Sequence, residues 1–315
     1  MQEGSTIDTK NDMTCLAIES GGSGTRLALA GPDETILHEA HCRSASPLYR
    51  DANGFQAEFA GTLDRVLQAE GVIPEAIAVV GLAGPADRAS IHAALKHRLP
   101  RVPRIEHSEG ELGLARYDLQ EGIALVAGTG ASCHAIDHQG TRSAIGGYGP
   151  QFGDEGSAYW IGREGLRAAF RAEQKRGEET KLLEAARDFY HIESPWQLLD
   201  EAQAGGHIAA PRVAEFAAAV DGVAADWDKT ARAILEEAGT HLGNLVIDMA
   251  ARTDFDVEPI PLVFTGGVFH AKRVLSAIEA TLSRSPYLFA YHPVVLEPIS
   301  GLIRLLQRDI TIRNT

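Results

Sequence analysis

The sequence ESGGSGTRLALAG, residues 19–31, decides the fold because it joins two apolar strands through a turn of small residues. We expect the first strand at about 14–19, ending on an acid, and the second at 25–30. Three interpretations are open for such a turn: a plain β-hairpin, a loop that binds nucleotide phosphates, or part of a dinucleotide-binding fingerprint. For a single isolated turn the hairpin is favoured, because glycine supplies the positive φ that tight turns need.

A second turn of the same kind lies in GIALVAGTGASCHAID, residues 122–137. Each turn opens a meander of three predicted strands. Later in each half of the chain, a predicted strand is followed by glycines and then by a predicted helix. These segments are IAVVGLAGP at 77–85 and PLVFTGGVFHAKRVL at 261–275. One plan therefore occurs twice. Backbone N–H groups in glycine turns form concave anion sites, so two such turns facing one cleft would grip a polyphosphate.

Several common nucleotide and catalytic motifs are absent from the sequence. The turn at 21–26 has no lysine and leads into a strand, which disfavours a P-loop. GSGTRL and GTGASC lack the third glycine of the dinucleotide fingerprint, and both lead into strands where that motif requires a helix. The nucleophile-elbow, HExxH and protein-kinase patterns are also missing.

Length and composition limit the class of protein. A chain of 315 residues is long enough for two domains. Its net charge of -14 argues against a nucleic-acid partner, which requires clustered basic residues. Cys15, Cys42 and Cys133 are widely spaced and suggest neither disulfides nor a zinc site. The polar first residues and the lack of a long apolar run predict a cytoplasmic protein with no membrane partner.

These motifs resemble those of the actin-like, sugar-kinase superfamily, and within it the N-acetylglucosamine kinase and BadF-type ATPase family. ESGGSGTR is similar to the family's first phosphate loop, VAGTGASC to its second, and VFTGGV to its adenosine motif. VVGLAG and EPISGLIRLL are similar to its connecting segments. The most specific match is GGYGPQFGDEGSAYWIG at 146–162, because GDEGS followed by Tyr-Trp-Ile is a long family-typical string. The pieces occur in family order from Thr14 to Leu306.

The resemblance implies an α/β fold of two ribonuclease-H-like domains, the actin-like ATPase fold, with Mg-ATP in the interdomain cleft. We expect a disordered tail at 1–13, an N-terminal domain at 14–120, and a C-terminal domain at 121–298 that carries a helical insertion. Whether a C-terminal helix at 299–315 returns to the N-terminal domain is left open. Family members are commonly dimers, so the resemblance also implies a homodimer.

The resemblance assigns nucleotide and metal contacts to the glycine-rich segments. The residues that match the phosphate and adenosine motifs are Gly21, Gly22, Ser23, Gly24, Thr25, Gly128, Thr129, Gly130, Gly266 and Gly267. Glu19 falls where the family has an aspartate that holds Mg²⁺ through water. The alternative is a solvated acid at a strand end, but beside a phosphate loop the metal role is favoured. The implied cofactors are ATP and Mg²⁺.

The predicted catalytic residue is Glu109, which falls where the family's catalytic aspartate contacts the sugar at a strand end. A general base must lie within about 3 Å of the proton it accepts. Glutamate is longer than aspartate by one methylene, and a misplacement of about 1 Å can cost on the order of 10²-fold in rate. Two alternatives stay open: Glu109 is an acid favoured by a helix dipole, or Glu111 is the base.

Asp154 and Glu155 match the GDEGS acids, which in the family contact sugar hydroxyls. Asp154 is also a candidate N-cap for a helix expected over 155–170. Tyr159 and Trp160 are expected to face the core of the domain, because they lie inside this helix and one of its faces must pack.

Two serines distinguish the predicted acceptor site from that of the family. Ser46 and Ser132 stand where family members have asparagines that contact the amino sugar. A hydroxyl cannot reproduce the two-ended hydrogen bonding of an amide. The nucleotide half therefore matches the family, whereas the acceptor half is altered.

The resemblance implies an ATP-dependent carbohydrate kinase that phosphorylates a hydroxyl group of an amino sugar such as N-acetylglucosamine, or of a related sugar such as glucosamine or N-acetylmuramic acid. A small-molecule sugar is thus the expected partner. One alternative is a BadF-type ATPase that couples hydrolysis to a partner protein, although the scattered cysteines lack a convincing match to its iron–sulfur ligands. Another is a catalytically weak sugar or nucleotide sensor, which glutamates at positions 19 and 109 would favour.

Overall fold

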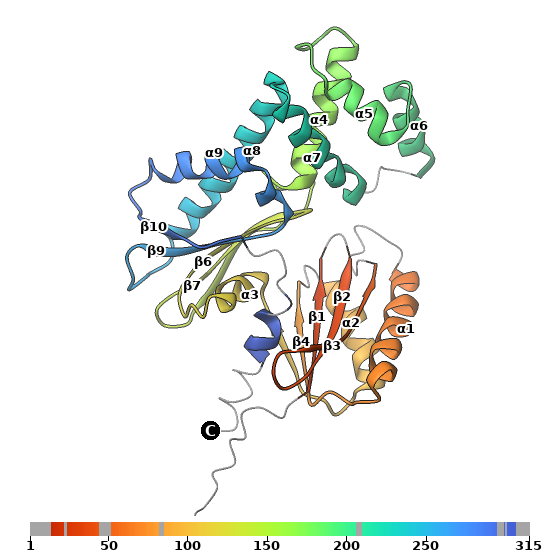
Figure 1. Cartoon of the computed structure of the whole chain (residues 1–315), viewed down its shortest axis with the longest axis vertical. Helices are drawn as coiled ribbons and strands as arrows, with labels where there is room; N and C mark the ends of the chain where they lie inside the picture. Colours follow the sequence, from red (N-terminus) through yellow and green to blue (C-terminus); the bar gives the residue numbers. More distant parts are fainter. Residues whose placement is uncertain are drawn as a thin grey trace, which may run out of the picture. The chain divides into compact units, whose positions relative to one another are not determined.

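The chain folds into two units, which are described separately (Figure 1). Unit 1 is formed by Met1–Arg116 and Glu297–Thr315, and unit 2 by Tyr117–Leu296. The computed structural model describes residues 14–21, 24–43, 52–81, 85–205, 210–294, 299 and 301–306.

Unit 1 is built on a five-stranded sheet in the order β3-β2-β1-β4-β5. Its strands are β1 (Cys15–Ser20), β2 (Thr25–Ala30), β3 (Ile36–Cys42), β4 (Ala76–Val80) and β5 (Arg104–His107). The first three form an antiparallel meander, and β4 and β5 extend the sheet in parallel. The ends of β1 and β4 therefore lie at the same edge.

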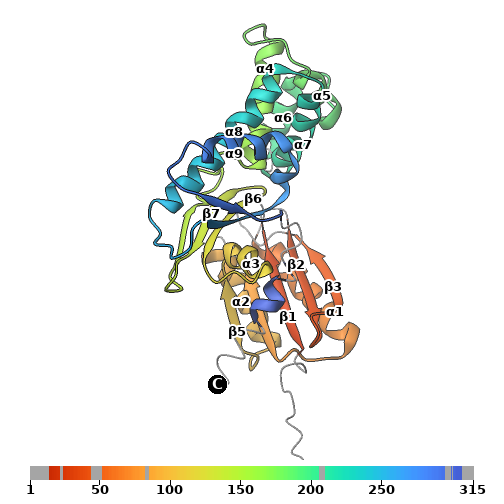
Figure 2. The ribbon, with the colours of Figure 1, turned by 60° about the vertical axis from the view of Figure 1, so that its left-hand side comes forward.

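Helices cover both faces of this sheet, so its central strands read as continuous apolar runs. Successive side chains of a strand point to opposite faces. Leu16 and Ile18 pack with α1 (Ala52–Glu70) and α2 (Pro85–Arg98) on one face. The residues that cover the other face come from α3 (Glu109–Arg116) and from the C-terminal helical residues 299 and 301–306, which lie on the same side in Figure 2.

Unit 2 repeats this plan in the strand order β10-β9-β6-β7-β8. The strands are β6 (Gly122–Ala127), β7 (Ala131–Ile136), β8 (Arg142–Gly146), β9 (Ile260–Thr265) and β10 (Phe289–Tyr291). Again an antiparallel meander comes first and two parallel strands follow. The duplication predicted from the two glycine turns is confirmed. Strand β10 was not predicted.

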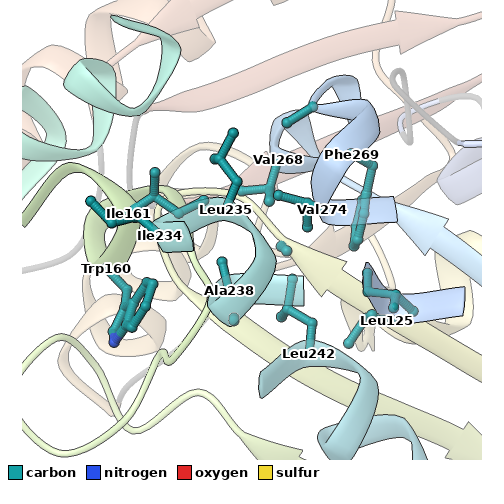
Figure 3. Close-up of a cluster of buried hydrophobic side chains, with 14 of the residues drawn as sticks. Leu125, Trp160, Ile161, Ile234, Leu235, Ala238, Leu242, Val268, Phe269 and Val274 are labelled. Atoms are coloured by element: carbon teal, nitrogen blue, oxygen red, sulfur yellow. The ribbon is translucent and has the colours of Figure 1, made fainter. Parts of the chain in front are cut away.

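The helices of unit 2 form its large core against one face of this sheet. They are α4 (Ala158–Glu173), α5 (Leu182–Tyr190), α6 (Pro195–Gly205), α7 (Ala210–Ala225), α8 (Lys229–Ala250), the 3-10 helix η1 (Gly267–His270) and α9 (Lys272–Leu282). Helices α8 and α9 run side by side in Figures 1 and 2. Figure 3 shows Leu242 of α8 and Val274 of α9 directed toward Leu125 of the sheet. None of the helices in the described ranges is long and apolar enough to span a membrane.

Candidate active site

The first glycine turn closes the β1–β2 hairpin of unit 1. Ser20 and Thr25 are the last paired residues, and their buried hydroxyl groups are 2.9 Å apart. Inside the turn, Gly21 N–H donates to the Gly24 carbonyl at 2.8 Å. The hairpin interpretation is therefore confirmed, and it is compatible with a phosphate loop. The remaining predicted members of this loop, Gly22 and Ser23, lie outside the described residues.

Two acids meet at the edge of the unit 1 sheet, next to this turn. Glu19 lies one residue before the end of β1, and Glu109 is the first residue of α3. Gly81 follows β4 with φ of 79°, and a Cβ atom there would lie 2.1 Å from the Ser20 carbonyl oxygen and 3.3 Å from Glu109 Oε1. The pKa of Glu19 is raised to about 7, chiefly by burial and then by the negative charge of Glu109, against the opposing effect of Arg26.

The chemistry of this pair fits Mg²⁺. Magnesium prefers oxygen ligands and usually takes one or two carboxylates, with phosphate and water completing its shell. A cation near Glu19 and Glu109 would offset their repulsion and favour the ionised carboxylates. In the described part of the chain there is no group of three or more histidine, cysteine, aspartate or glutamate side chains that could hold a metal.

The raised pKa of Glu19 predicts a stability that depends on pH. The ordinary pKa is 4.5 and the folded value is about 7, so the folded chain holds a proton that the unfolded chain releases. The contribution of this group to the free energy of unfolding is therefore fully present below about pH 4.5. It decreases as the pH rises from about 4.5 to about 7. We expect Glu19→Gln to stabilise the protein by about 2 kcal/mol at about pH 8, and much less at about pH 5. Denaturant titrations at the two pH values measure the difference.

Glu70→Gln is the matched control, because Glu70 is an exposed acid at the end of α1. We expect this variant to change stability little at either pH. An equal gain in stability for Glu19→Gln at both pH values would contradict the assignment of a raised pKa to Glu19.

The second glycine turn joins β6 to β7 in unit 2. Gly128 N–H donates to the Gly130 carbonyl at 2.9 Å. The carbonyls of Gly128 and Thr129 accept from Ala158 N–H at 2.9 Å and from Tyr159 N–H at 3.2 Å. A helix leaves its first N–H groups without partners inside the helix, so here the start of α4 is satisfied by the turn. The turn and the GDEGS segment therefore form one structural element.

Asp154 joins the same element through its side chain. It is 5% exposed, and its Oδ1 accepts from Ala131 N–H at 3.2 Å. A Cβ atom on Gly130 would lie 2.8 Å from Asp154 Oδ2, so only glycine fits there without movement. Burial raises the pKa of Asp154, although the Ala131 hydrogen bond opposes this shift. The carboxylate thus supports the turn, whatever other contacts it makes.

The prediction that Asp154 is the N-cap of a helix over 155–170 is wrong. The N-cap is Ser157, whose Oγ accepts from Trp160 N–H at 3.1 Å, and α4 begins at Ala158. Asp154 has φ of 60° and Gly156 has φ of 83°. These left-handed conformations cannot continue into a right-handed helix, so the helix starts later. Trp160 is 6% exposed and packs in the core, as predicted (Figure 3).

Of the other predicted acceptor residues, Ser132 lies next to this element and Glu155 is exposed. Ser132 follows Ala131 on β7, and its Oγ is 2.9 Å from His134 Nε2. No role was predicted for His134, although the two-residue period of a strand places it on the same face as Ser132. Ser46 lies outside the described residues.

The predicted adenosine motif contacts the second turn. Gly266 follows β9 with φ of 117°, and a Cβ atom on it would lie 2.4 Å from the Ala127 carbonyl oxygen and 3.2 Å from Gly128 N. A side chain would therefore push the two segments apart. Gly267 begins η1 and is exposed. Within unit 2 the structure brings together the Gly128–Gly130 turn, Gly266, Asp154 and Ser132.

Glu111, the alternative base, is a buried capping residue. It is 4% exposed, and its Oε2 accepts from Ser108 N–H at 2.7 Å. Its own N–H donates to Ser108 Oγ at 3.2 Å. This capping box was not predicted, although the spacing of serine and glutamate in SEGE is its signature. The carboxylate of Glu111 is therefore engaged in capping α3.

Comparisons with known proteins identify the family of the chain and its fold. Residues 16–290 match the model of the BadF/BadG/BcrA/BcrD ATPase family. An N-acetylmuramic acid/N-acetylglucosamine kinase from Clostridium acetobutylicum is 26% identical over 270 residues, which are 81% of this chain and 85% of that protein.

Two crystal structures share the fold. A candidate N-acetylglucosamine kinase from Porphyromonas gingivalis has a TM-score of 0.75 at 20% identity, covering 94% of this chain and 99% of that one. A ROK family glucokinase from Streptomyces griseus, in complex with glucose and AMPPNP, has a TM-score of 0.58 at 16% identity, with coverages of 94% and 99%. The predicted fold class of two ribonuclease-H-like domains is confirmed. By its sequence match over most of its length, the chain belongs to the BadF/BadG/BcrA/BcrD ATPase family.

Proposed function

We propose that this protein is an ATP-dependent kinase that phosphorylates a hydroxyl group of an amino sugar. The observation that carries the proposal is the compact element of unit 2, in which one glycine turn packs against both the Gly266 segment and the GDEGS segment. The predicted nucleotide motifs are thus in direct contact with the predicted acceptor motif. Such contact is expected in an enzyme that binds a nucleotide and a sugar together. The named activity of the relative from Clostridium acetobutylicum supports the same function.

The glycine segments are the proposed nucleotide site. The carbonyls of Gly128 and Thr129 accept hydrogen bonds from the first N–H groups of α4. The backbone N–H groups of glycine turns are suited to binding anions. The Gly21–Thr25 turn has the matching role in unit 1. Gly266 and Gly267 have no side chains, so an adenosine group could lie close to their backbone.

Glu109 is the proposed general base. Its carboxylate accepts the proton of the acceptor hydroxyl as the hydroxyl oxygen bonds to the γ-phosphorus and the bond from that phosphorus to the leaving ADP oxygen breaks. Glu19 is the residue proposed to hold Mg²⁺, through water. The chemistry that Mg²⁺ supplies when bound is neutralisation of the phosphate charge.

Ser132, Asp154 and Glu155 are the proposed acceptor contacts, with Ser46 outside the described residues. The hydroxyl of Ser132 is hydrogen-bonded to His134. Asp154 lies close to Ser132, because its carboxylate accepts a hydrogen bond from the N–H of the preceding residue, Ala131. N-acetylglucosamine and N-acetylmuramic acid are the first acceptors to examine, since the relative from Clostridium acetobutylicum is named for both. We further propose a cytoplasmic homodimer without a nucleic-acid partner, in keeping with the net charge of -14.

The cysteines give no support to a partner-coupled ATPase with an iron–sulfur cluster. Cys15, Cys42 and Cys133 are buried in three different hydrophobic clusters. Burial raises the pKa of Cys15 to about 12 and that of Cys42 to about 11. Thiolates are the metal-binding form of cysteine, so these positions disfavour cluster ligation.

ADP release with a panel of sugars tests the proposed function. The panel contains N-acetylglucosamine, N-acetylmuramic acid, glucosamine, glucose and a reaction without sugar. We expect ADP release that depends on an amino sugar and stops when EDTA removes Mg²⁺. ADP release at the same rate without sugar would instead indicate a partner-coupled ATPase, and no release with any sugar would indicate a sensor.

A further inference from the structure

The turn that presents Glu109 is held by polar side-chain contacts on both sides of that residue. Ser108 and Glu111 exchange the two hydrogen bonds of a capping box, at 2.7 and 3.2 Å. The second carboxylate oxygen of Glu111, Oε1, lies 3.4 Å from Nδ1 of His107. The side chains of His107 and Glu111 are 1% and 4% exposed. Both oxygens of this carboxylate therefore contact the β5–α3 turn itself.

This arrangement fixes the direction of the Glu109 side chain. Glu109 is the residue directly after the N-cap Ser108, so the capping box sets its backbone dihedral angles and hence the direction of its Cα–Cβ bond. Gly81 leaves room for the far end of this side chain, since a Cβ atom at position 81 would lie 3.3 Å from Glu109 Oε1. A glutamate base has one more rotatable bond than an aspartate, so it depends more on a fixed starting direction.

We propose that Glu111, together with Ser108, is a positioning residue that aims Glu109 at the acceptor hydroxyl. The inference rests on the proposed function, because it requires Glu109 to be the base. Glu111 does not touch the reacting atoms. A displacement of the base by about 1 Å lowers the rate on the order of 10²-fold without a matching loss of substrate binding. Loss of the Glu111 carboxylate should thus lower kcat and leave KM for ATP nearly unchanged.

Variants of the capping box in the full chain test this inference. Glu111→Ala removes both side-chain contacts, whereas Glu111→Gln keeps an oxygen that can accept from Ser108 N–H. We expect Glu111→Ala to lower kcat about 10- to 100-fold with KM for ATP changed less than about twofold. Glu111→Gln should recover kcat to within about threefold of wild type. Ser108→Ala, which removes only the hydroxyl half, should give an intermediate loss of kcat.

Asp228→Ala is the matched control, because Asp228 caps α8 in unit 2 by accepting from Ala231 N–H at 2.9 Å. It should lower Tm without lowering kcat. The inference is overturned if Glu111→Ala and Ser108→Ala turn over like wild type, or if Glu111→Gln is as inactive as Glu111→Ala. Should Glu111→Ala fail to fold, Ser108→Ala and Glu111→Gln decide the question. Wild-type protein without acceptor-dependent turnover would refute the proposed function itself, which is a separate outcome.

Discussion

Replacing Glu109 by glutamine is expected to lower acceptor-dependent kcat by at least about 10²-fold and to leave ATP binding unchanged. Glutamine keeps the size of the side chain beside Gly81 but cannot accept a proton at neutral pH. The measurement is kcat with the best sugar of the panel, together with calorimetric titration of AMPPNP. Glu106→Gln, an acid on β5 with a side chain 38% exposed, is the control and should turn over normally.

Unchanged turnover in Glu109→Gln would remove Glu109 from the mechanism. Because the carboxylate of Glu111 is committed to Ser108 and His107, the next acid to examine would then be Asp154. Glu109→Asp adds a second comparison, since the resemblance to sugar kinases implies an aspartate at this position. If the capping box is adapted to the longer side chain, Glu109→Asp should be slower than wild type but faster than Glu109→Gln.

Replacing Gly266 by alanine is expected to weaken nucleotide binding by at least about tenfold and to lower stability by about 2 kcal/mol. The new Cβ atom would lie 2.4 Å from the Ala127 carbonyl oxygen, and φ of 117° is unfavourable for alanine. The segment after β9 would therefore move away from the second glycine turn. Titration with AMPPNP and thermal unfolding measure the two effects.

Gly267→Ala separates the two effects, because no atom lies within 4 Å of a Cβ atom at this position. It should fold with wild-type stability, so a loss of AMPPNP affinity would report contact with the nucleotide alone. Gly222→Ala in α7, also in open space, should leave AMPPNP affinity unchanged and raise stability by about 0.5–1 kcal/mol, because alanine favours a helix interior more than glycine does. Wild-type AMPPNP affinity in Gly266→Ala would contradict the assignment of this segment to the nucleotide site.

Local patterns predicted most of the fold. The apolar strands around each glycine turn gave the repeated meander, because a strand buried on both faces reads as an unbroken apolar run. Trp160 was placed in the core by helical periodicity. Strand β10 was missed because three residues carry too little pattern to distinguish a short edge strand from a loop.

Side-chain roles that depend on contacts between distant residues could not be predicted. The hydrogen bond from Ala131 to Asp154 joins residues that lie 23 positions apart, so the sequence offered only an N-cap or a sugar contact for this acid. The same holds for position 266, where the carbonyl oxygen of Ala127 leaves no room for a Cβ atom and only glycine fits. The capping box at Ser108 is different, because its spacing is local and could have been recognised before the structure.

Whether the protein is a sugar kinase is tested by the ratio of sugar phosphate formed to ADP released, measured by mass spectrometry on the same reaction. We expect one sugar phosphate for each ADP with the preferred amino sugar, and loss of both products in Glu109→Gln. ADP accompanied by inorganic phosphate, with no phosphorylated sugar, would contradict this expectation.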